Sequence, residues 1–261
     1  METLIQMILP SAVVPALLSA WVWWFNQYKS IVLWALPVIW FPSFVWLIGW
    51  PSVIPAEANH WLYPLAVFSV LISLYIKTRL NLISVLQTLL LALVLIAISW
   101  PVLQYQFNWM LLFELLAVIV AGFVLFNFSV KRQAKTPALI MAVSSGGMGL
   151  VVALGGSLLI GQLAGALASI LITLAVVELM TKMQNPAAAL SSFVPVMQLY
   201  FGILIIARIY AEIPLGPSAL LLMAPLAGLM SAKRYALGFS AACVIVALSL
   251  LLLATDSSNY Y

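Results

Sequence analysis

Three ionisable side chains lie inside long apolar stretches of this sequence: Glu114, Glu178 and Arg208. Charges are costly inside a membrane, so residues of this kind are usually functional or paired. Glu178 precedes Lys182 by four residues. Arg208 likewise precedes Glu212 by four. This is the spacing of neighbours on one helix face, so we expect a structural ion pair at both places. Glu114 has no such neighbour and is our candidate for a functional ionisable group, with an interfacial carboxylate as the alternative.

A short run of small residues is the second place where chemistry could occur. It comprises Ser144, Ser145, Gly146, Gly147 and Gly149. Glycines weaken a helix, and unwound backbone at membrane depth is tolerated where protein or a water-filled cavity covers it. The two hydroxyls could then line a path for a small polar solute. Tight packing against a neighbouring helix is the alternative, and we favour it for this run.

Two amides join the candidates for a solute path. Gln162 follows the glycine-rich run, and Gln198 follows a proline that loosens its helix. Hydrogen bonds between helices, each contributing about 0.6–2 kcal/mol, are the alternative role for such amides. The series Gly161, Gly165 and Ser169 has the four-residue spacing of small residues that lets two membrane helices approach closely. It predicts a packing surface.

Catalysis finds little support in the sequence. The single histidine, His60, lies between two apolar stretches, and the single aspartate, Asp256, lies near the C-terminus. No apolar stretch therefore holds a Ser–His pair or two aspartates. The clusters of His, Cys and carboxylates that bind a metal or haem are missing from the apolar stretches as well. We expect a protein that is not an enzyme and that has no cofactor and no metal.

The elements that position these residues must be membrane helices. Hydrophobic residues make up 66% of the chain and charged residues only 6%, whereas soluble domains are about a quarter charged. This composition cannot build a soluble surface, so the expected partner is the lipid bilayer. The single cysteine, Cys243, lies in an apolar stretch and forms no internal disulfide. The net charge of +4 does not indicate nucleic acid, because the basic residues gather on one side of the membrane.

Apolar windows of about 17 to 25 residues, the length that a bilayer requires, divide the chain into ten segments, of which the ninth is shorter than this. Their approximate bounds are 4–25, 31–50, 61–76, 80–103, 109–130, 137–155, 158–180, 191–210, 217–230 and 235–254. A turn at Gly155, Gly156 and Ser157 separates the sixth from the seventh. The connections are too short for a soluble domain. We predict an all-α, polytopic transmembrane helix bundle of about ten spans, forming one domain over residues 1–261.

The basic residues test this count independently, because cytoplasmic loops of membrane proteins retain Lys and Arg. Nine of the ten basic residues fall in the odd-numbered connections, and the even-numbered connections contain none. Arg208, near the end of the eighth segment, is the exception. The alternation predicts an inner-membrane protein with both termini on the outer, periplasmic face.

Ten helices divide into two sets of five, residues 1–130 and 131–261. An odd number in each set gives the second set the opposite orientation, as in inverted-repeat transporters. Pro37 and Pro42 interrupt the second segment, whereas its counterpart, the seventh, contains no proline. The 5+5 inverted arrangement is therefore a geometric option without support from a matched pair of broken helices.

Two functions fit these observations. The first is permease-like transport of a small neutral or weakly polar solute along a path through the candidate residues. The second is a non-catalytic membrane subunit or scaffold, whose glycine- and tryptophan-rich faces bind other membrane subunits or a second copy of the chain. An intramembrane or lipid-modifying enzyme ranks well below both for want of catalytic residues.

Overall fold

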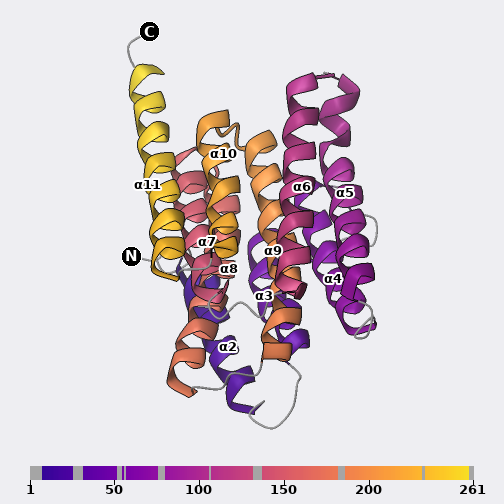
Figure 1. Ribbon diagram of the computed structural model, residues 1–261. Helices are drawn as coiled ribbons and strands as arrows, with labels where there is room; N and C mark the ends of the chain where they lie inside the picture. The colour runs from indigo at the N-terminus through magenta and orange to yellow at the C-terminus, as the bar shows by residue number, and fades with distance from the viewer. Residues whose placement is uncertain are drawn as a thin grey trace.

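The computed structural model describes residues 8–25, 32–51, 55, 57–75, 80–105, 107–131, 137–181, 186–230 and 233–258. Within these ranges the chain forms ten α-helices and three short π or 3-10 segments, with no strand (Figure 1). The α-helices are α2 (Val14–Phe25), α3 (Val32–Ile48), α4 (Leu62–Tyr75), α5 (Leu80–Tyr105), α6 (Trp109–Lys131), α7 (Pro137–Leu154), α8 (Leu158–Thr181), α9 (Pro186–Tyr210), α10 (Leu215–Met223) and α11 (Lys233–Ser258). The short segments are η1 (Leu9–Val13), η2 (Ala58–Trp61) and η3 (Ala224–Leu229).

Each of the ten expected segments contains one of these helices, so the all-α prediction and the helix positions are confirmed. The bounds of most segments shift by a few residues, and two of the differences concern α9 and α10. Helix α9 begins at Pro186, earlier than the expected residue 191. The ninth segment is divided, because α10 gives way to η3 at Ala224, next to Pro225. Proline has no N–H for an α-helical hydrogen bond, which accounts for the change to a tighter helix there.

Helix α9 lies at the centre of the bundle. Every residue from 194 to 207 is buried. Helices α3, α4, α5, α6, α7, α8 and α10 all pack against it. A helix that is apolar on all sides is stable when it is covered on all sides. Two polar residues of α9, Gln198 in its middle and Arg208 near its end, are therefore held among other helices.

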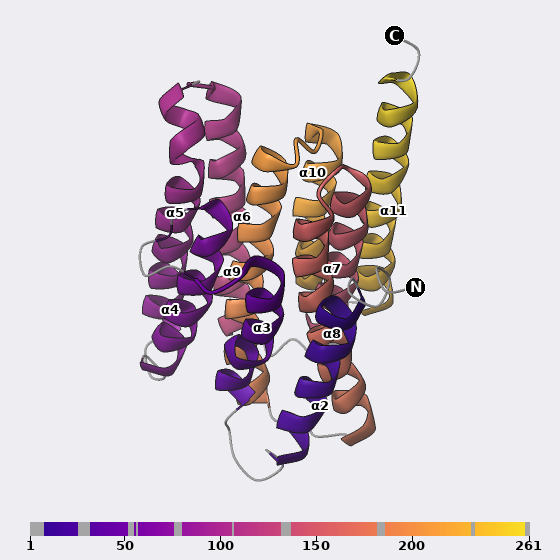
Figure 2. The ribbon, with the colours of Figure 1, turned by 180° about the vertical axis from the view of Figure 1, so that it is seen from behind.

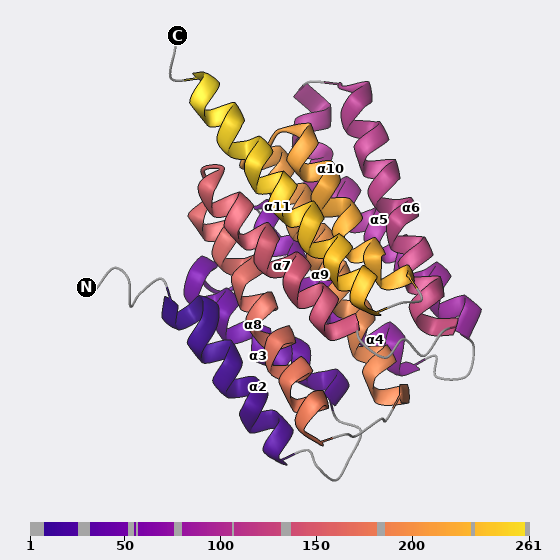
Figure 3. The same cartoon turned by 60° about the vertical axis from the view of Figure 1, so that its left-hand side comes forward.

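Six of the other helices form two groups on either side of α9. Helices α4, α5 and α6 pack together on one side, and α7, α8 and α11 lie on the other (Figures 1 and 2). Helix α11 crosses over α7 and α10, as Figure 3 shows. The α5–α6, α7–α8 and α9–α10 connections and the end of α11 all lie toward one end of the bundle, the upper end in Figures 1 and 2. We call this the α5–α6 end.

Helices α7 and α8 form a tight hairpin. The turn between them lies at Gly155, Gly156 and Ser157, as the sequence predicts. Gly156 has a φ of 117°, a conformation that side chains with a Cβ rarely adopt. The N–H groups of Gly155 and Ser157 donate to the carbonyls of Val151 and Val152, at 2.8 and 3.1 Å. These bonds cap the last turn of α7 and let the chain reverse within a few residues.

Four of the described helices contain apolar stretches long enough to cross a membrane. The stretches are Leu82–Tyr105, Trp109–Asn127, Leu158–Val176 and Tyr235–Ala254, with 24, 19, 19 and 20 residues. A hydrocarbon core about 30 Å thick needs about 20 helical residues. Large apolar side chains cover their outer faces, for example Leu93 and Leu253, which are 67% and 66% exposed. Contiguous apolar faces of this extent suit lipid rather than water.

Candidate functional site

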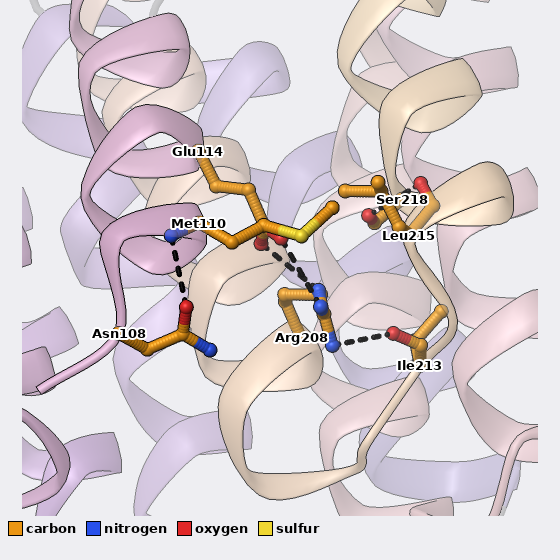
Figure 4. A network of polar contacts seen from close by, with 7 residues as sticks. All are labelled: Asn108, Met110, Glu114, Arg208, Ile213, Leu215 and Ser218. Carbon is orange, nitrogen blue, oxygen red and sulfur yellow. Dashed lines mark hydrogen bonds and ion pairs between the residues drawn. The ribbon is translucent and has the colours of Figure 1, made fainter. Parts of the chain in front are cut away.

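Glu114 and Arg208 form an ion pair that joins α6 to α9 near the α5–α6 end of the bundle (Figure 4). Arg208 Nε donates to Glu114 Oε2 at 2.9 Å, and Nη2 donates to Oε1 at 3.1 Å. The pair is bidentate, the arrangement that gives carboxylate and guanidinium their strongest contact. The side chains of Glu114 and Arg208 are 13% and 27% exposed. Both charges therefore lie mostly within the protein.

The expected pairing of Arg208 with Glu212 is wrong, because α9 ends at Tyr210 and the helical spacing is lost. Arg208 binds Glu114 instead, and its Nη1 donates to the carbonyl of Ile213 at 3.1 Å. Glu212 has a φ of 51°, the left-handed conformation that turns the chain back toward the guanidinium. The other expected pair, Glu178 with Lys182, involves side chains outside the described ones.

A cavity of about 250 Å³ lies beside the ion pair, between α6, α9 and α10. Glu114, Arg208 and Ser218 line it at one level, one residue from each helix. The next turn of each helix, farther from the α5–α6 end, contributes an apolar side chain. These side chains are Val118, Leu204 and Leu222. Residues four apart lie above one another on a helix, so the ion pair lies one turn from these side chains, and the surface of the cavity itself is almost entirely apolar.

Part of the hydrogen-bonding capacity of the ion pair is not used by the described residues. A guanidinium has five N–H groups, and three of those of Arg208 are used within the described residues. A carboxylate offers about four acceptor positions, and Glu114 uses two. The hydroxyl of Ser218 donates to the carbonyl of Leu215 at 2.9 Å and keeps its lone pairs as acceptors. Since the two charges cancel and the surface of the cavity is almost entirely apolar, the cavity suits a neutral group rather than an ion.

A second polar cluster lies deeper, where α9 meets α4 and α5. Gln198 Nε2 donates to the backbone carbonyl and to Oε1 of Gln87, at 2.7 and 3.0 Å. Gln87 Nε2 donates to the carbonyl of Ser69 and to the hydroxyl of Ser73, at 2.7 and 3.1 Å. Ser69 in turn donates to Gln87 Oε1 at 2.8 Å. All four side chains are at most 5% exposed. Gln198 therefore forms hydrogen bonds between helices, which is the common role of amide side chains in membrane helices.

The run from Ser144 to Gly149 lies within α7, whose backbone is helical throughout. Ser144 donates to the carbonyl of Ile140 at 2.9 Å, and its Oγ lies 3.1 Å from Oγ of Ser240 on α11. Ser145 is fully buried, and its hydroxyl has no hydrogen-bond partner among the described residues. A Cβ on Gly147 would overlap the side chain of Val244 on α11. This part of α7 is therefore a face covered by neighbouring helices.

The small residues of α8 also lie at helix contacts. A Cβ on Gly149 would lie 3.0 Å from the carbonyl oxygen of Gly161, and one on Gly161 would lie 2.8 Å from that of Gly149. A Cβ on Gly165 would contact Ser11 of η1, and Ser169 donates to the carbonyl of Ser11 at 3.1 Å. The series therefore packs against α7 at one end and η1 at the other.

Of the residues singled out for a solute path, Glu114 is the one that lines the cavity described above. Gly146 comes near Ala168 of α8, and Gln162 is half-buried on α8. Sequence reasoning missed Arg208 and Ser218 as members of this site. No local pattern identifies them, because each comes from a different helix. Within the described residues no three His, Cys, Asp or Glu side chains come together as a metal ion would require.

The fold defines the class: an all-helical bundle in which four of the described helices are long and apolar enough to cross a membrane. Comparison with known proteins adds no family, since no family model, no curated protein and no solved structure matches this chain. Any functional proposal must therefore come from the site itself.

Proposed function

We propose that the protein is a permease-like membrane protein that moves a small, neutral or weakly polar solute across the bilayer. The cavity beside Glu114 and Arg208 is its solute site at the outer face. The observation that supports this proposal is the hollow lined by an ion pair in a bundle with very few charges. Keeping two charges partly out of water is costly unless they are well paired. An ion pair beside a cavity therefore indicates a functional site.

In this proposal all ten helices cross the inner membrane, and both termini lie on the periplasmic side. The alternation of basic connections supports this orientation. The α5–α6 end of the bundle is then the outer end, and the solute site opens near the periplasm. Helices α2–α6 and α7–α11 are the two sets of five, and their inverted arrangement is part of the proposal.

Flux into proteoliposomes tests the proposal. Purified protein is reconstituted, and uptake of a panel of neutral solutes, such as urea, glycerol and short diols, is followed by vesicle swelling. At least one solute should enter several-fold faster than in protein-free vesicles. Equal rates for every solute in the panel would contradict the proposal.

A matched pair of variants on α10 locates the site. Ala219 lines the cavity, whereas Met223, one turn farther along, is exposed and does not. Ala219→Phe should fill the cavity and reduce the flux at least tenfold. Met223→Phe adds an aromatic ring outside it and should leave the flux within twofold. Equal loss in both variants would place the path elsewhere.

The second candidate is a non-catalytic subunit or scaffold. Its specific support is the close packing of the run around Gly147, where neighbouring helices fill the space that a path would need. Helix α11 also presents an apolar outer face that includes Ile245 and Leu253, 62% and 66% exposed. Purification in mild detergent separates the two proposals. A scaffold should bring down partner chains in fixed stoichiometry, whereas a permease should purify alone or as copies of itself.

A further inference from the structure

We propose that the cavity between α6, α9 and α10 holds a hydrocarbon chain of a bilayer lipid, which enters from the side and lies along the helices. Three observations support this occupant: the apolar surface of the cavity, its opening toward lipid and its length along the helices. A chain fills the cavity whether or not the protein moves a solute, so this proposal and the proposed function can fail separately.

The surface of the cavity is almost entirely apolar, although an ion pair lies beside it. The polar atoms of Glu114 and Arg208 bind one another, and the hydroxyl of Ser218 donates to the carbonyl of Leu215. These residues therefore line the cavity mainly through carbon atoms. Water in an apolar cavity lacks the polar partners that it needs. A hydrocarbon chain needs none.

The cavity has a buried floor and an opening toward lipid. Leu204 and Ile205 of α9, which we call the floor, line it and are each 2% exposed. Phe113, which also lines it, is 68% exposed, and Ala117 and Ala219 on the two flanking helices are exposed as well. Exposed apolar side chains of a membrane bundle face lipid. A chain in the surrounding lipid can therefore reach the floor without passing through water.

The cavity extends along the helices, as a lipid chain does in a bilayer. Its lining residues on α6 run from Met110 to Val118, which is about 12 Å along the helix axis. Those on α10 run from Leu215 to Leu222, about 10 Å. Met110 and Leu215 lie in the first turns of their helices. The cavity thus begins near the α5–α6 end and continues toward the centre of the bundle.

The volume suits part of one chain. A cavity of about 150 Å³ accommodates benzene. In proportion, the volume of about 250 Å³ here holds about ten carbon atoms. A segment of one acyl chain fits, whereas the second chain and the head group of a phospholipid remain outside. The cavity should therefore select for a chain and not for a particular head group.

A chain that enters from the bilayer gains contacts rather than escape from water. Lipid tails are as apolar as the aliphatic side chains of the cavity, so the hydrophobic effect contributes little to the transfer. The gain comes from dispersion contacts with side chains that otherwise face a void. Because lipid chains surround the bundle at the concentration of a solvent, a small gain is enough to keep the cavity filled.

Photolabelling in lipid nanodiscs tests the occupant without requiring transport. The probe is a phosphatidylcholine with a diazirine in one acyl chain, and its adducts are mapped by tandem mass spectrometry. The floor residues should be labelled at least fivefold more than Ile203 and Ile206, which are also buried on α9 but do not line the cavity. Lipid that only coats the outer surface reaches none of these four side chains. Equal labelling of the two pairs would overturn the proposal.

The position of the diazirine tests how the chain lies. A diazirine near the carboxyl end of the chain should favour adducts on Met110 and Leu215, and one farther along the chain should favour Val118 and Leu222. The reverse order would contradict a chain that enters from the α5–α6 end. A phosphatidylglycerol probe with the same chain should label the floor within twofold of the phosphatidylcholine probe. A larger difference would show that a head group, and not the chain, determines binding.

Matched variants separate the cavity from the rest of the lipid-facing surface. Ala117→Phe and Ala219→Phe place a ring on either wall of the cavity and should reduce labelling of the floor at least fivefold. Leu116→Phe and Met223→Phe place the same ring at exposed positions outside the lining and should leave it within twofold. Equal labelling in all four variants would place the chain elsewhere.

The flux assay keeps the two proposals apart. Labelling of the floor in a protein that moves no solute would reject the proposed transport and keep the lipid-chain site. Solute flux without labelling of the floor would reject the lipid chain alone.

Discussion

Removing either partner of the Glu114–Arg208 pair leaves a charge in largely apolar surroundings. Loss of one partner of a fully buried pair costs about 3–5 kcal/mol. Because these side chains are 13% and 27% exposed, we expect Glu114→Gln or Arg208→Gln alone to lower the free energy of unfolding by about 1–3 kcal/mol. The double variant should lose less than the sum of the two, with a coupling energy of about 1 kcal/mol or more.

The single cysteine of the chain allows the unfolding of these variants to be measured. Cys243 is 6% exposed, so a thiol-reactive fluorogenic dye reports unfolding without any engineered label. Thermal curves of the four proteins in one detergent complete the double-mutant cycle. Leu116→Gln, on the exposed face of α6, serves as a control for adding an amide to that helix. Strict additivity would show that the two side chains contribute independently.

Sequence reasoning identified Glu114 without a partner and paired Arg208 with Glu212 instead, for a physical reason. Local spacing finds only partners on the same helix. The two residues of this pair are 94 positions apart and meet because α6 and α9 pack together. The same limit applies to Ser218, an unremarkable serine in the sequence that lines the cavity only because α10 packs on α9.

At the scale of helices, adjacent glycines in α7 should respond oppositely to the same substitution. A Cβ on Gly146 would lie 3.7 Å from Ala168, an ordinary contact, whereas one on Gly147 would overlap Val244. Gly146→Ala should therefore raise the free energy of unfolding by up to about 1 kcal/mol, through helix propensity. Gly147→Ala should lower it by about 1–3 kcal/mol, through overpacking. The Cys243 dye assay measures both.

Shortening the side chain of Val244 provides the control for these two glycine variants. In a Val244→Ala background, Gly147→Ala should leave the free energy of unfolding nearly unchanged. The effect of Gly146→Ala on the free energy of unfolding should be the same in this background as in the unmodified protein. If both glycines tolerated alanine equally, α11 would not pack on α7 as closely as the structure has it.

The connection between α9 and α10 contains one strained residue. A left-handed conformation costs a residue with a Cβ about 1–2 kcal/mol, and Glu212 adopts it at a φ of 51°. Glu212→Gly should remove this strain. After the greater flexibility of glycine in the unfolded chain is subtracted, the gain in stability should be about 0.5–1 kcal/mol. Glu212→Val should lower stability, because β-branched residues tolerate this conformation worst. Both are measured as thermal midpoints, and equal effects would contradict the strain.

For the molecule as a whole, hydropathy and charge predicted where the helices lie in the sequence. They did not predict which helices lie at the centre of the bundle and which lie at its surface. Lipid is as apolar as a protein core, so a central helix and a lipid-facing helix have similar composition. Helix α9, buried from residue 194 to 207, and α11, with Ile245 and Leu253 exposed, are both apolar along most of their length. Which helix lies in the centre depends on shape complementarity among all ten, and periodicity does not encode it.

Cysteine labelling in cells tests the orientation of the bundle. In a Cys243→Ala background, single cysteines replace Phe107, at the α5–α6 connection, and Ser258, at the end of α11. A membrane-impermeant maleimide should label both in intact cells. A cysteine at Gln133, a basic connection outside the described residues, should react only after permeabilisation.

Six helices separate Phe107 from Ser258. The two positions therefore lie on the same side of the membrane only if an even number of these helices cross it, as they do when all six cross. The shortest candidate is α10 with η3, whose nine α-helical and six 3-10 residues span about 25 Å, slightly less than a hydrocarbon core of about 30 Å. Labelling of Phe107→Cys without Ser258→Cys would mean that an odd number of these helices do not cross, and this segment would be the first to examine. Labelling of Gln133→Cys alone would reverse the orientation and place the Glu114–Arg208 cavity on the cytoplasmic side.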